Sequence, residues 1–228
     1  VDYSYLWHWS EDADEITPVA DGWYTHAELD DNDEVVRWPT PGAWKSNVCA
    51  PSLAFDDNGD LYCVFNYYPL NDNSTSDYCN GEIYATVSED NGATWYVPTN
   101  ISETRTHQAE LGESACEEYP TLAATVDDFL HISYMLDTEP GSVIQAIRGN
   151  EVATLGFWYY HKVPVEDIAR EEIWDDGPSF HREVVPVVLG PRRDPATPVP
   201  DQSVIVTAEV VGEIIDLAFV EILWTIDG

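Results

Sequence analysis

The sequence predicts an all-β protein, and the strongest indication is an internal repeat whose copies lie 69 residues apart. Residues 51–54 (Pro-Ser-Leu-Ala) match residues 120–123 (Pro-Thr-Leu-Ala), and each copy continues as strand, turn, strand. Asp, Asn and Gly residues in the predicted turns are the expected breakers between strands. The second strands are predicted at 61–65 and 130–134, and the third strands at 82–87 and 156–161.

The most specific local pattern is a turn that runs from Ser88 to Trp95. Asp90 is placed to accept backbone N–H bonds across this turn, and Gly92 permits a positive φ. Thr94 adds a hydroxyl to the same network, and the Trp95 ring returns to cover the hairpin with apolar area. These residues predict a structural turn without a catalytic role. The alternative is an ordinary polar hairpin turn, because Asp-Asn-Gly turns are common in β proteins.

The spacing of these residues, S-x-D-x-G-x-T-W, resembles the Asp-box, or BNR repeat, of sialidase-type β-propellers. Residues 3–12 resemble the same strand running into a degenerate box that lacks the Gly. Residues 44–168 are similar to secreted, acidic BNR-repeat proteins of environmental bacteria, in which immunoglobulin-like modules follow the propeller. The resemblance implies a sialidase-like β-propeller built from four-stranded blades. It is weakly specific for activity, since glycosidases, adhesins and receptors share this architecture.

The predicted blades do not close a propeller. Residues 1–180 hold about two to three blades, whereas closed propellers contain roughly 4–8. An open arc would leave apolar faces and strand edges in water. We therefore expect other polypeptide segments to complete the sheets. Either residues 1–180 are the C-terminal part of a propeller whose remaining segments belong to the same protein, or other chains complete the sheets in trans.

The chain changes character after the predicted propeller. Residues 181–200 contain five prolines and predict a semi-extended linker. Residues 203–210 and 219–226 alternate with a period of two and predict two strands. These strands resemble the start of an immunoglobulin-like sandwich over residues 201–228, which is incomplete because such a sandwich needs about seven strands.

The charge of the chain excludes two classes of partner. The formal net charge is −34, from 43 Asp and Glu against 9 Lys and Arg. Such a surface repels nucleic acid phosphates and anionic membranes, and no apolar run reaches membrane-spanning length. We therefore expect no nucleic acid partner and no membrane insertion. Acid-rich, lysine-poor chains suit high salt or calcium, which screen the self-repulsion, as well as secretion.

Four cysteines lack the spacing of a zinc site, so two disulfides are expected. The propeller resemblance implies Cys49–Cys116, which precede equivalent strands of adjacent blades, and Cys63–Cys79, which flank one hairpin. Disulfides imply an oxidising compartment, so we expect a secreted, extracellular or cell-surface protein. Asn73 and Asn100 begin N-glycosylation sequons, which matter only in a source that glycosylates.

No catalytic set is recognisable in the sequence. Sialidases hold the substrate carboxylate with three arginines and use a Tyr nucleophile, a Glu and an Asp. The seven arginines here lie in loop-like segments or the linker, without a Tyr and Glu at recognisable spacing. Acid pairs such as Glu117-Glu118 and Asp175-Asp176 are expected to be solvated charges.

The only cofactor that the sequence suggests is calcium. The loop that carries Asp56, Asn58 and Asp60 has the oxygen density of a calcium site. It matches no 12-residue EF-hand loop, however, and a solvated turn is the favoured interpretation.

We therefore expect a non-catalytic extracellular module with a binding or structural role. Clustered tryptophans and tyrosines suit a glycan-binding surface, although rings at strand spacing belong more often to the core. The alternative is an exo-sialidase or related glycoside hydrolase whose catalytic residues lie largely outside this segment.

Overall fold

The computed structural model describes residues 4–11, 13–22, 27–32, 34–42, 45–110, 112–141, 156–173, 187–194 and 205–211. The chain divides into two compact units, Val1–Pro178 and Ser179–Gly228. About half of the described residues are in strands, none is in an α-helix, and a single 3₁₀ turn spans Val165–Asp167. The prediction of an all-β protein is confirmed.

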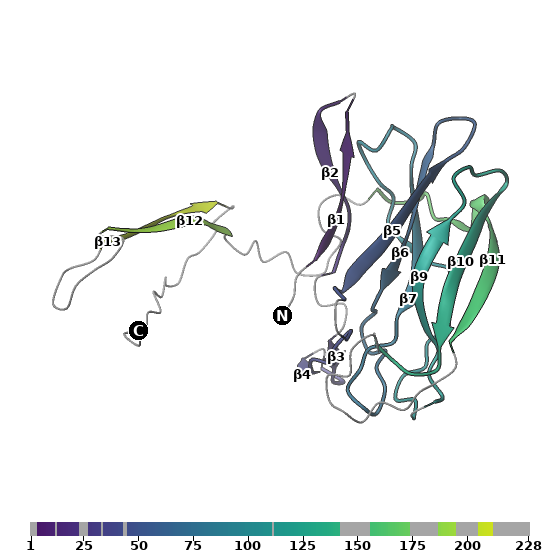
Figure 1. The fold of residues 1–228 in the computed structure, drawn as a ribbon, viewed down its shortest axis with the longest axis horizontal. Helices are drawn as coiled ribbons and strands as arrows, with labels where there is room; N and C mark the ends of the chain where they lie inside the picture. Colours follow the sequence, from purple (N-terminus) through teal and green to yellow (C-terminus); the bar gives the residue numbers. More distant parts are fainter. Residues whose placement is uncertain are drawn as a thin grey trace. The chain divides into compact units, whose positions relative to one another are not determined.

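Within the described part of the first unit, four antiparallel sheets form (Figure 1). One contains four strands in the order β5-β6-β7-β8, and a second contains three in the order β11-β10-β9. The pairs β1-β2 and β3-β4 form the other two. The bounds are β1 Tyr5–Ser10, β2 Glu15–Asp21, β3 Glu28–Leu29, β4 Val35–Arg37, β5 Val48–Phe55, β6 Leu61–Tyr67, β7 Glu82–Ser88, β8 Thr99–Asn100, β9 Cys116–Leu122, β10 Phe129–Asp137 and β11 Phe157–Pro164.

The repeat found in the sequence is also a repeat of backbone geometry. The β5–β6 pairing shifts register between Cys49 and Ser52, and the β9–β10 pairing shifts between Glu118 and Thr121, which lie 69 residues further on. Each shift contains one non-glycine residue in the left-handed region, at φ 53° for Ala50 and 55° for Tyr119. Left-handed residues other than glycine are uncommon, so this coincidence shows that both sheets are built on one plan with one bulge.

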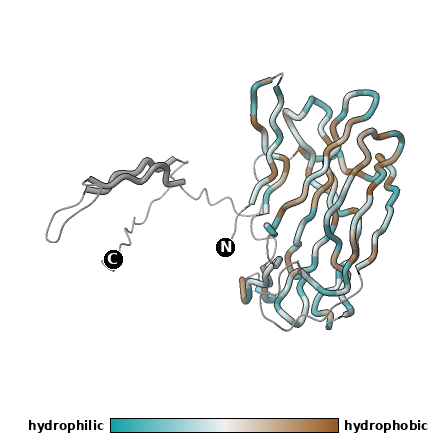
Figure 2. The backbone as a smooth tube through the Cα atoms, viewed as in Figure 1, coloured by the Kyte–Doolittle hydropathy of each residue, from teal (hydrophilic) through white to brown (hydrophobic). Residues whose placement is uncertain are grey.

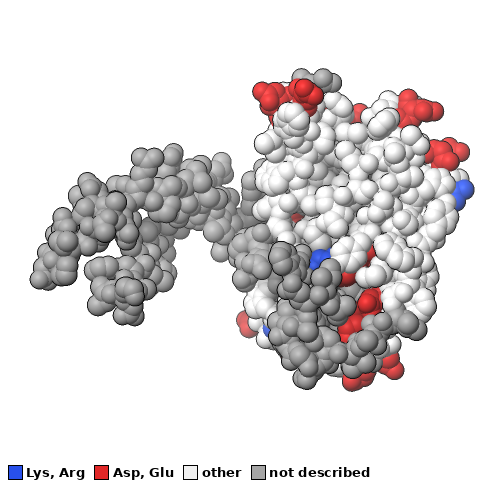
Figure 3. Space-filling view, in the orientation of Figure 1, with Lys and Arg blue, Asp and Glu red and all other residues white. Residues whose placement is uncertain are grey.

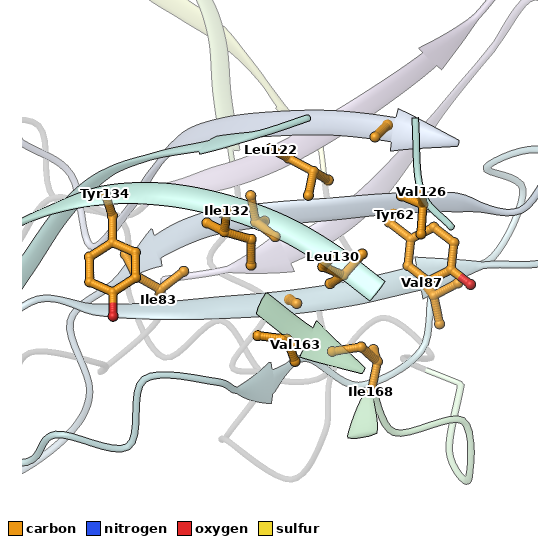
Figure 4. Packing of buried hydrophobic residues seen from close by; sticks show 13 residues of the cluster. Tyr62, Ile83, Val87, Leu122, Val126, Leu130, Ile132, Tyr134, Val163 and Ile168 are labelled. Carbon is orange, nitrogen blue, oxygen red and sulfur yellow. The ribbon is translucent and has the colours of Figure 1, made fainter. Parts of the chain in front are cut away.

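The β5–β8 sheet is covered on both faces, so β6 and β7 are buried along almost their whole length. On one face, Ile83 of β7 and Ile132 of β10 belong to one core cluster (Figure 4), which also contains Val64 of β6. On the other face, Phe65 packs against Leu6 of β1 in a second cluster. Strands that are buried on both faces lose the simple alternation of half-buried strands. Hydrophilic residues concentrate in the loops that join the strands (Figure 2).

A buried amide joins the two repeats at the bulge of β9. Asn66 has no exposed surface, and its Nδ2 donates to Glu117 O at 2.6 Å and to Glu82 O at 3.4 Å. Its Oδ1 accepts from Tyr119 N at 3.0 Å. A bulge leaves backbone groups without ladder partners, and buried backbone groups must be paired. Asn66 supplies those partners from the neighbouring sheet.

The second unit contains one antiparallel pair, β12 (Val187–Asp194) with β13 (Ile205–Val211). The strand predicted at 203–210 therefore corresponds to β13. Within the segment 181–200 that was predicted to be a linker, residues 187–194 form β12. Proline is tolerated there because Pro191 falls in the register shift between Leu189 and Arg192, where a ladder N–H is not needed. The strand predicted at 219–226 lies outside the described residues.

Replacing Asn66 should destabilise the junction between the repeats more than its size suggests. Asn66→Leu keeps the side-chain volume but leaves two backbone carbonyls and one N–H buried without partners. We expect a loss of about 2–4 kcal/mol in the free energy of unfolding, measured with urea. The control, Asn58→Leu in an exposed turn, should cost less than about 1 kcal/mol. Equal losses in the two variants would contradict the role of Asn66.

Candidate functional site

The turn between β7 and β8 brings together all five residues that the sequence singled out. The Asp90 carboxylate accepts from Thr94 N at 2.8 Å, from Thr94 Oγ1 at 2.6 Å and from Ser88 Oγ at 2.9 Å. Gly92 N donates to Ser88 Oγ at 2.8 Å, and Trp95 is buried in the second core cluster. Partial burial opposes ionisation of Asp90, but these hydrogen bonds outweigh it and lower the pKa of the carboxyl.

This turn also contacts segments on both of its sides, which the sequence did not predict. Thr17 Oγ1 of β2 donates to Gly92 O at 2.5 Å, and the His8 ring of β1 lies over Gly92. Arg170, which follows the 3₁₀ turn, donates to Glu89 Oε1 at 3.0 Å. The turn therefore connects three segments of the first unit, and its chemistry is structural.

The acidic loop at residues 56–60 uses its oxygens within the turn. Asp56 Oδ1 accepts from Asn58 N at 2.9 Å and from Asp60 N at 3.0 Å. The turn after β3 repeats this arrangement, with Asp30 Oδ1 accepting from Asn32 N at 2.8 Å and from Glu34 N. A recurring turn accounts for the acidic pattern. Among the described residues, no group of three or more His, Cys, Asp or Glu side chains could hold a metal ion.

All four cysteines are free thiols, so neither predicted disulfide is present. Cys63 pairs with Thr86 across β6 and β7, whereas Cys79 lies beyond the end of that ladder, where Tyr67 pairs with Glu82. The four residue steps from Cys63 to Tyr67 span about 13 Å. Cys79, which lies beyond Tyr67, is therefore too far from Cys63 for a disulfide, in which the two Cα atoms lie within about 7 Å of each other.

Burial lowers the reactivity of the thiols. It raises the pKa of Cys63 to about 12 and also raises the pKa values of Cys49, Cys79 and Cys116. Cys49 is the one thiol that is only half-buried. Because the thiolate is the reactive form, the folded chain presents no activated cysteine within its described residues.

Both predicted sequons have their amides engaged inside the fold. Asn73 is buried, and its Nδ2 donates to Glu28 Oε2 and to Ser74 O, each at 3.2 Å. Asn100 Nδ2 donates to Glu82 Oε2, and Asn100 Oδ1 accepts from Glu103 N at 3.1 Å. A glycan on either amide nitrogen would displace these contacts.

Three arginines of the first unit are described, and each has its own partners. Arg37 pairs with Glu28 and Asp77, and Arg105 donates to Asn71 O at 2.6 Å. Arg170 pairs with Glu89 and also donates to Tyr62 Oη at 2.9 Å. These contacts hold loops in place and do not converge on one point. Arg192 and Arg193 belong to β12, while Arg148 and Arg182 lie outside the described residues.

The expectation that Glu117 and Glu118 are solvated is wrong. Their exposed fractions are 0% and 2%, and Glu82 is also buried at 1%. Tyr68 Oη donates to Glu118 Oε1 at 3.0 Å. Lys45 Nζ lies 3.8 Å from the same oxygen and 3.7 Å from the centroid of the Tyr119 ring. The other acid pair, Asp175-Asp176, lies outside the described residues.

A group of three buried carboxyls lies where β7 and β9 begin. Asn80 Nδ2 donates to Asp72 Oδ1 at 2.9 Å, and Thr104 Oγ1 donates to Glu117 Oε2 at 2.7 Å. Burial raises the pKa values of Glu82 and Glu117 to about 7, and it raises that of Asp72 as well. Sequence reasoning missed this cluster because Asp72 and Glu117 are far apart in the chain.

Comparison with protein-family models, with curated proteins and with solved structures finds no match. The fold and the candidate sites therefore rest on the residues of this chain. Within the described ranges, no helix has the length and apolar character that crossing a membrane requires.

Substituting Gly92 tests the contact between the turn and β1. An ideal Cβ on Gly92 would lie 2.1 Å from the His8 ring, and φ is 84°. Gly59→Ala is the matched control, since φ is 94° but nothing lies within 4 Å. We expect the control to cost about 1 kcal/mol and Gly92→Ala to cost about 1–3 kcal/mol more in urea unfolding.

Removing the His8 ring separates two contributions to the destabilisation by Gly92→Ala: the clash with the ring and the strain of a positive φ. In a His8→Ala background, Gly92→Ala should reduce the free energy of unfolding only as much as Gly59→Ala does. If the excess cost persists without the ring, the contact does not explain it.

Counting thiols tests the state of the cysteines. After denaturation without reductant, four thiols should react with a disulfide-forming reagent, whereas in the native protein only half-buried Cys49 should react appreciably. Two reactive thiols after denaturation would instead indicate one disulfide, and peptide mapping would decide whether it is Cys49–Cys116.

Proposed function

We propose that this chain is a non-catalytic extracellular or cell-surface module of the β-propeller type, which binds or assembles through the outer faces of its sheets. The observation that carries the proposal is the aromatic surface of β11. Trp158 and Tyr160 are 70% and 65% exposed, although they lie in the middle of a paired strand. Large exposed aromatic patches on sheets are typical of interaction surfaces.

The internal repeat supports this interpretation of the β11 face. In the first repeat, Tyr62 and Val64 of β6 are buried against the second sheet. The corresponding residues of the second repeat are His131 and Ser133, which are paired with Lys162 and Tyr160 on the outward face. The face of the second sheet that carries His131 and Ser133 is therefore partly exposed, whereas the equivalent face of the first sheet is buried.

A second aromatic surface lies on the β1–β2 hairpin. Leu6 belongs to the core cluster shared with the β5–β8 sheet, whereas Trp7 and Trp9 are 58% and 56% exposed. Ile16 pairs with Trp9 and is exposed as well. In Figure 3 the acidic groups gather largely at the loop ends, which leaves much of the visible surface between them uncharged.

Two occupants suit these faces. Further sheets of the same type, from the same polypeptide or another chain, would extend the packing between sheets already present. A glycan would stack its sugar faces on Trp158 and Tyr160. His131 supports this platform, since its ring stacks on Tyr160 and its Nδ1 lies 2.6 Å from Tyr160 Oη.

The alternative, a sialidase-like hydrolase, finds less support in the described residues. The Tyr68–Glu118 pair has the residue types of a Tyr nucleophile and its activating Glu. Burial, reinforced by the neighbouring Glu118, raises the pKa of Tyr68 well above its ordinary value, the opposite of activation. Arg37, Arg105 and Arg170 are engaged elsewhere, so they do not provide the carboxylate clamp.

The binding proposal is tested by sedimentation of the purified chain over a range of concentrations in high salt, together with a screen against immobilised glycans. We expect self-association, glycan binding or both. Trp158→Ser with Tyr160→Ser should weaken the interaction at least tenfold. The control, Val36→Ser, removes an exposed apolar residue on β4 and should have no effect. A monomer that binds no glycan would overturn the proposal.

The hydrolase alternative is tested with a fluorogenic sialoside in the same high-salt buffer, where we expect no turnover. Turnover that Tyr68→Phe abolishes, without a change in the thermal midpoint, would establish the alternative.

A further inference from the structure

We propose that Asp72, Glu82 and Glu117 form a proton-operated clasp, which holds the loops 68–81 and 101–115 on the strand ends when protonated and releases them when ionised. The three residues come from different segments: Asp72 from the first loop, Glu82 from the start of β7, and Glu117 from β9. The clasp is independent of the outer aromatic faces and of the function proposed for them.

The hydrogen bonds around the cluster show what it connects. Asp72 Oδ1 accepts from Asn80 Nδ2 at 2.9 Å and from Thr106 N at 3.2 Å, which ties both loops to one carboxyl. Glu82 is held by Asn100, and Glu117 by Thr104 of the second loop. The carboxyls therefore contribute contacts between the two loops, through Asp72 and Thr106, and between the second loop and β9, through Thr104 and Glu117.

The geometry favours protonated carboxyls. Asp72, Glu82 and Glu117 are 2%, 1% and 0% exposed, and a carboxyl removed from water favours its neutral form unless a cation pairs with it. Asp72 Oδ2, Asn80 Oδ1 and Glu117 Oε1 are buried and have no hydrogen-bond partner. All three orphan atoms are acceptors, so the cluster lacks donors, and protonation of the carboxyls supplies them.

The other charged or titratable groups that face the cluster do not neutralise it. Arg105 favours the ionised form of Asp72, but its guanidinium is exposed and donates to Asn71 O. Tyr84 of β7, Tyr134 of β10 and Cys79 are neutral groups with raised pKa values. Full ionisation would therefore place up to three negative charges in a buried space with one exposed cation nearby.

The internal repeat shows that the fold does not need an acid at this place. Glu117 corresponds to Val48, which is buried at the same point of the equivalent bulge in the first repeat. A buried carboxyl is costly unless it is paired, so its presence in only one repeat indicates a role beyond the bulge.

The direction of the pH effect follows from the raised pKa values. Unfolded glutamates release their protons near pH 4.5, whereas Glu82 and Glu117 hold theirs to about pH 7. Their contribution to stability is complete below about pH 4.5 and is lost as the pH rises towards and past 7. The clasp is therefore closed in acid and open in mild alkali.

Hydrogen–deuterium exchange between pH 5 and 9, with rates divided by the intrinsic rate at each pH, tests the clasp in the full chain. Protection of peptides from 68–81 and 101–115 should fall at least tenfold between pH 6 and 8, while peptides from β6 and β10 stay protected. Unchanged protection of the loops would overturn the proposal.

Variants distinguish a loss of loop protection caused by the three carboxyls from a general destabilisation of the protein at high pH. Glu82→Gln with Glu117→Gln should abolish the pH dependence, and Glu117→Val, which copies the first repeat, serves if the double variant fails to fold. Glu113→Gln removes an exposed charge from the same loop and should behave as the wild type. Equal loss of protection in all variants would overturn the clasp. If calcium alone restored the protection of the loops at pH 8, the three carboxyls would be a cation site instead of a proton-operated clasp, which would overturn the proposal.

Discussion

The junction between the two repeats depends on the buried amide of Asn66. The bulge in β9 turns Tyr119 into the left-handed region and removes backbone groups from the ladder with β10. Those groups lie in the interior, where water cannot pair them. Because an amide carries both donors and an acceptor, one side chain satisfies Glu117 O and Tyr119 N together. Leaving these backbone groups unpaired at the junction would cost the desolvation penalty of buried polar groups.

The same bulge determines where the buried acids lie. It brings Glu117 towards Asp72 and Thr104, and it brings Glu118 towards Tyr68 and Lys45. Bulges commonly redirect side chains next to functional sites. In the first repeat the equivalent bulge carries Val48 and Cys49 instead, so one backbone plan supports an apolar junction in one sheet and a polar junction in the other.

The turn from Ser88 to Trp95 has a complementary role at the other end of β7. Its internal hydrogen bonds form from residues within four positions of one another, so the turn is specified locally. Its position in the fold is set by the contacts of Gly92 with His8 and Thr17, and of Glu89 with Arg170. A locally stable turn thereby becomes a point where three segments are held together.

The sequence by itself determined the features that depend on near neighbours: the strand periods, the Ser88–Trp95 turn and the 69-residue repeat. Tertiary structure decided what depends on distant residues. Glu117 and Glu118 looked like solvated charges, yet they are buried. Cys63 and Cys79 looked close in sequence, yet the strand register separates them. Turn chemistry acts over a few covalent bonds, whereas burial and electrostatic environment arise only when segments far apart in the chain pack together.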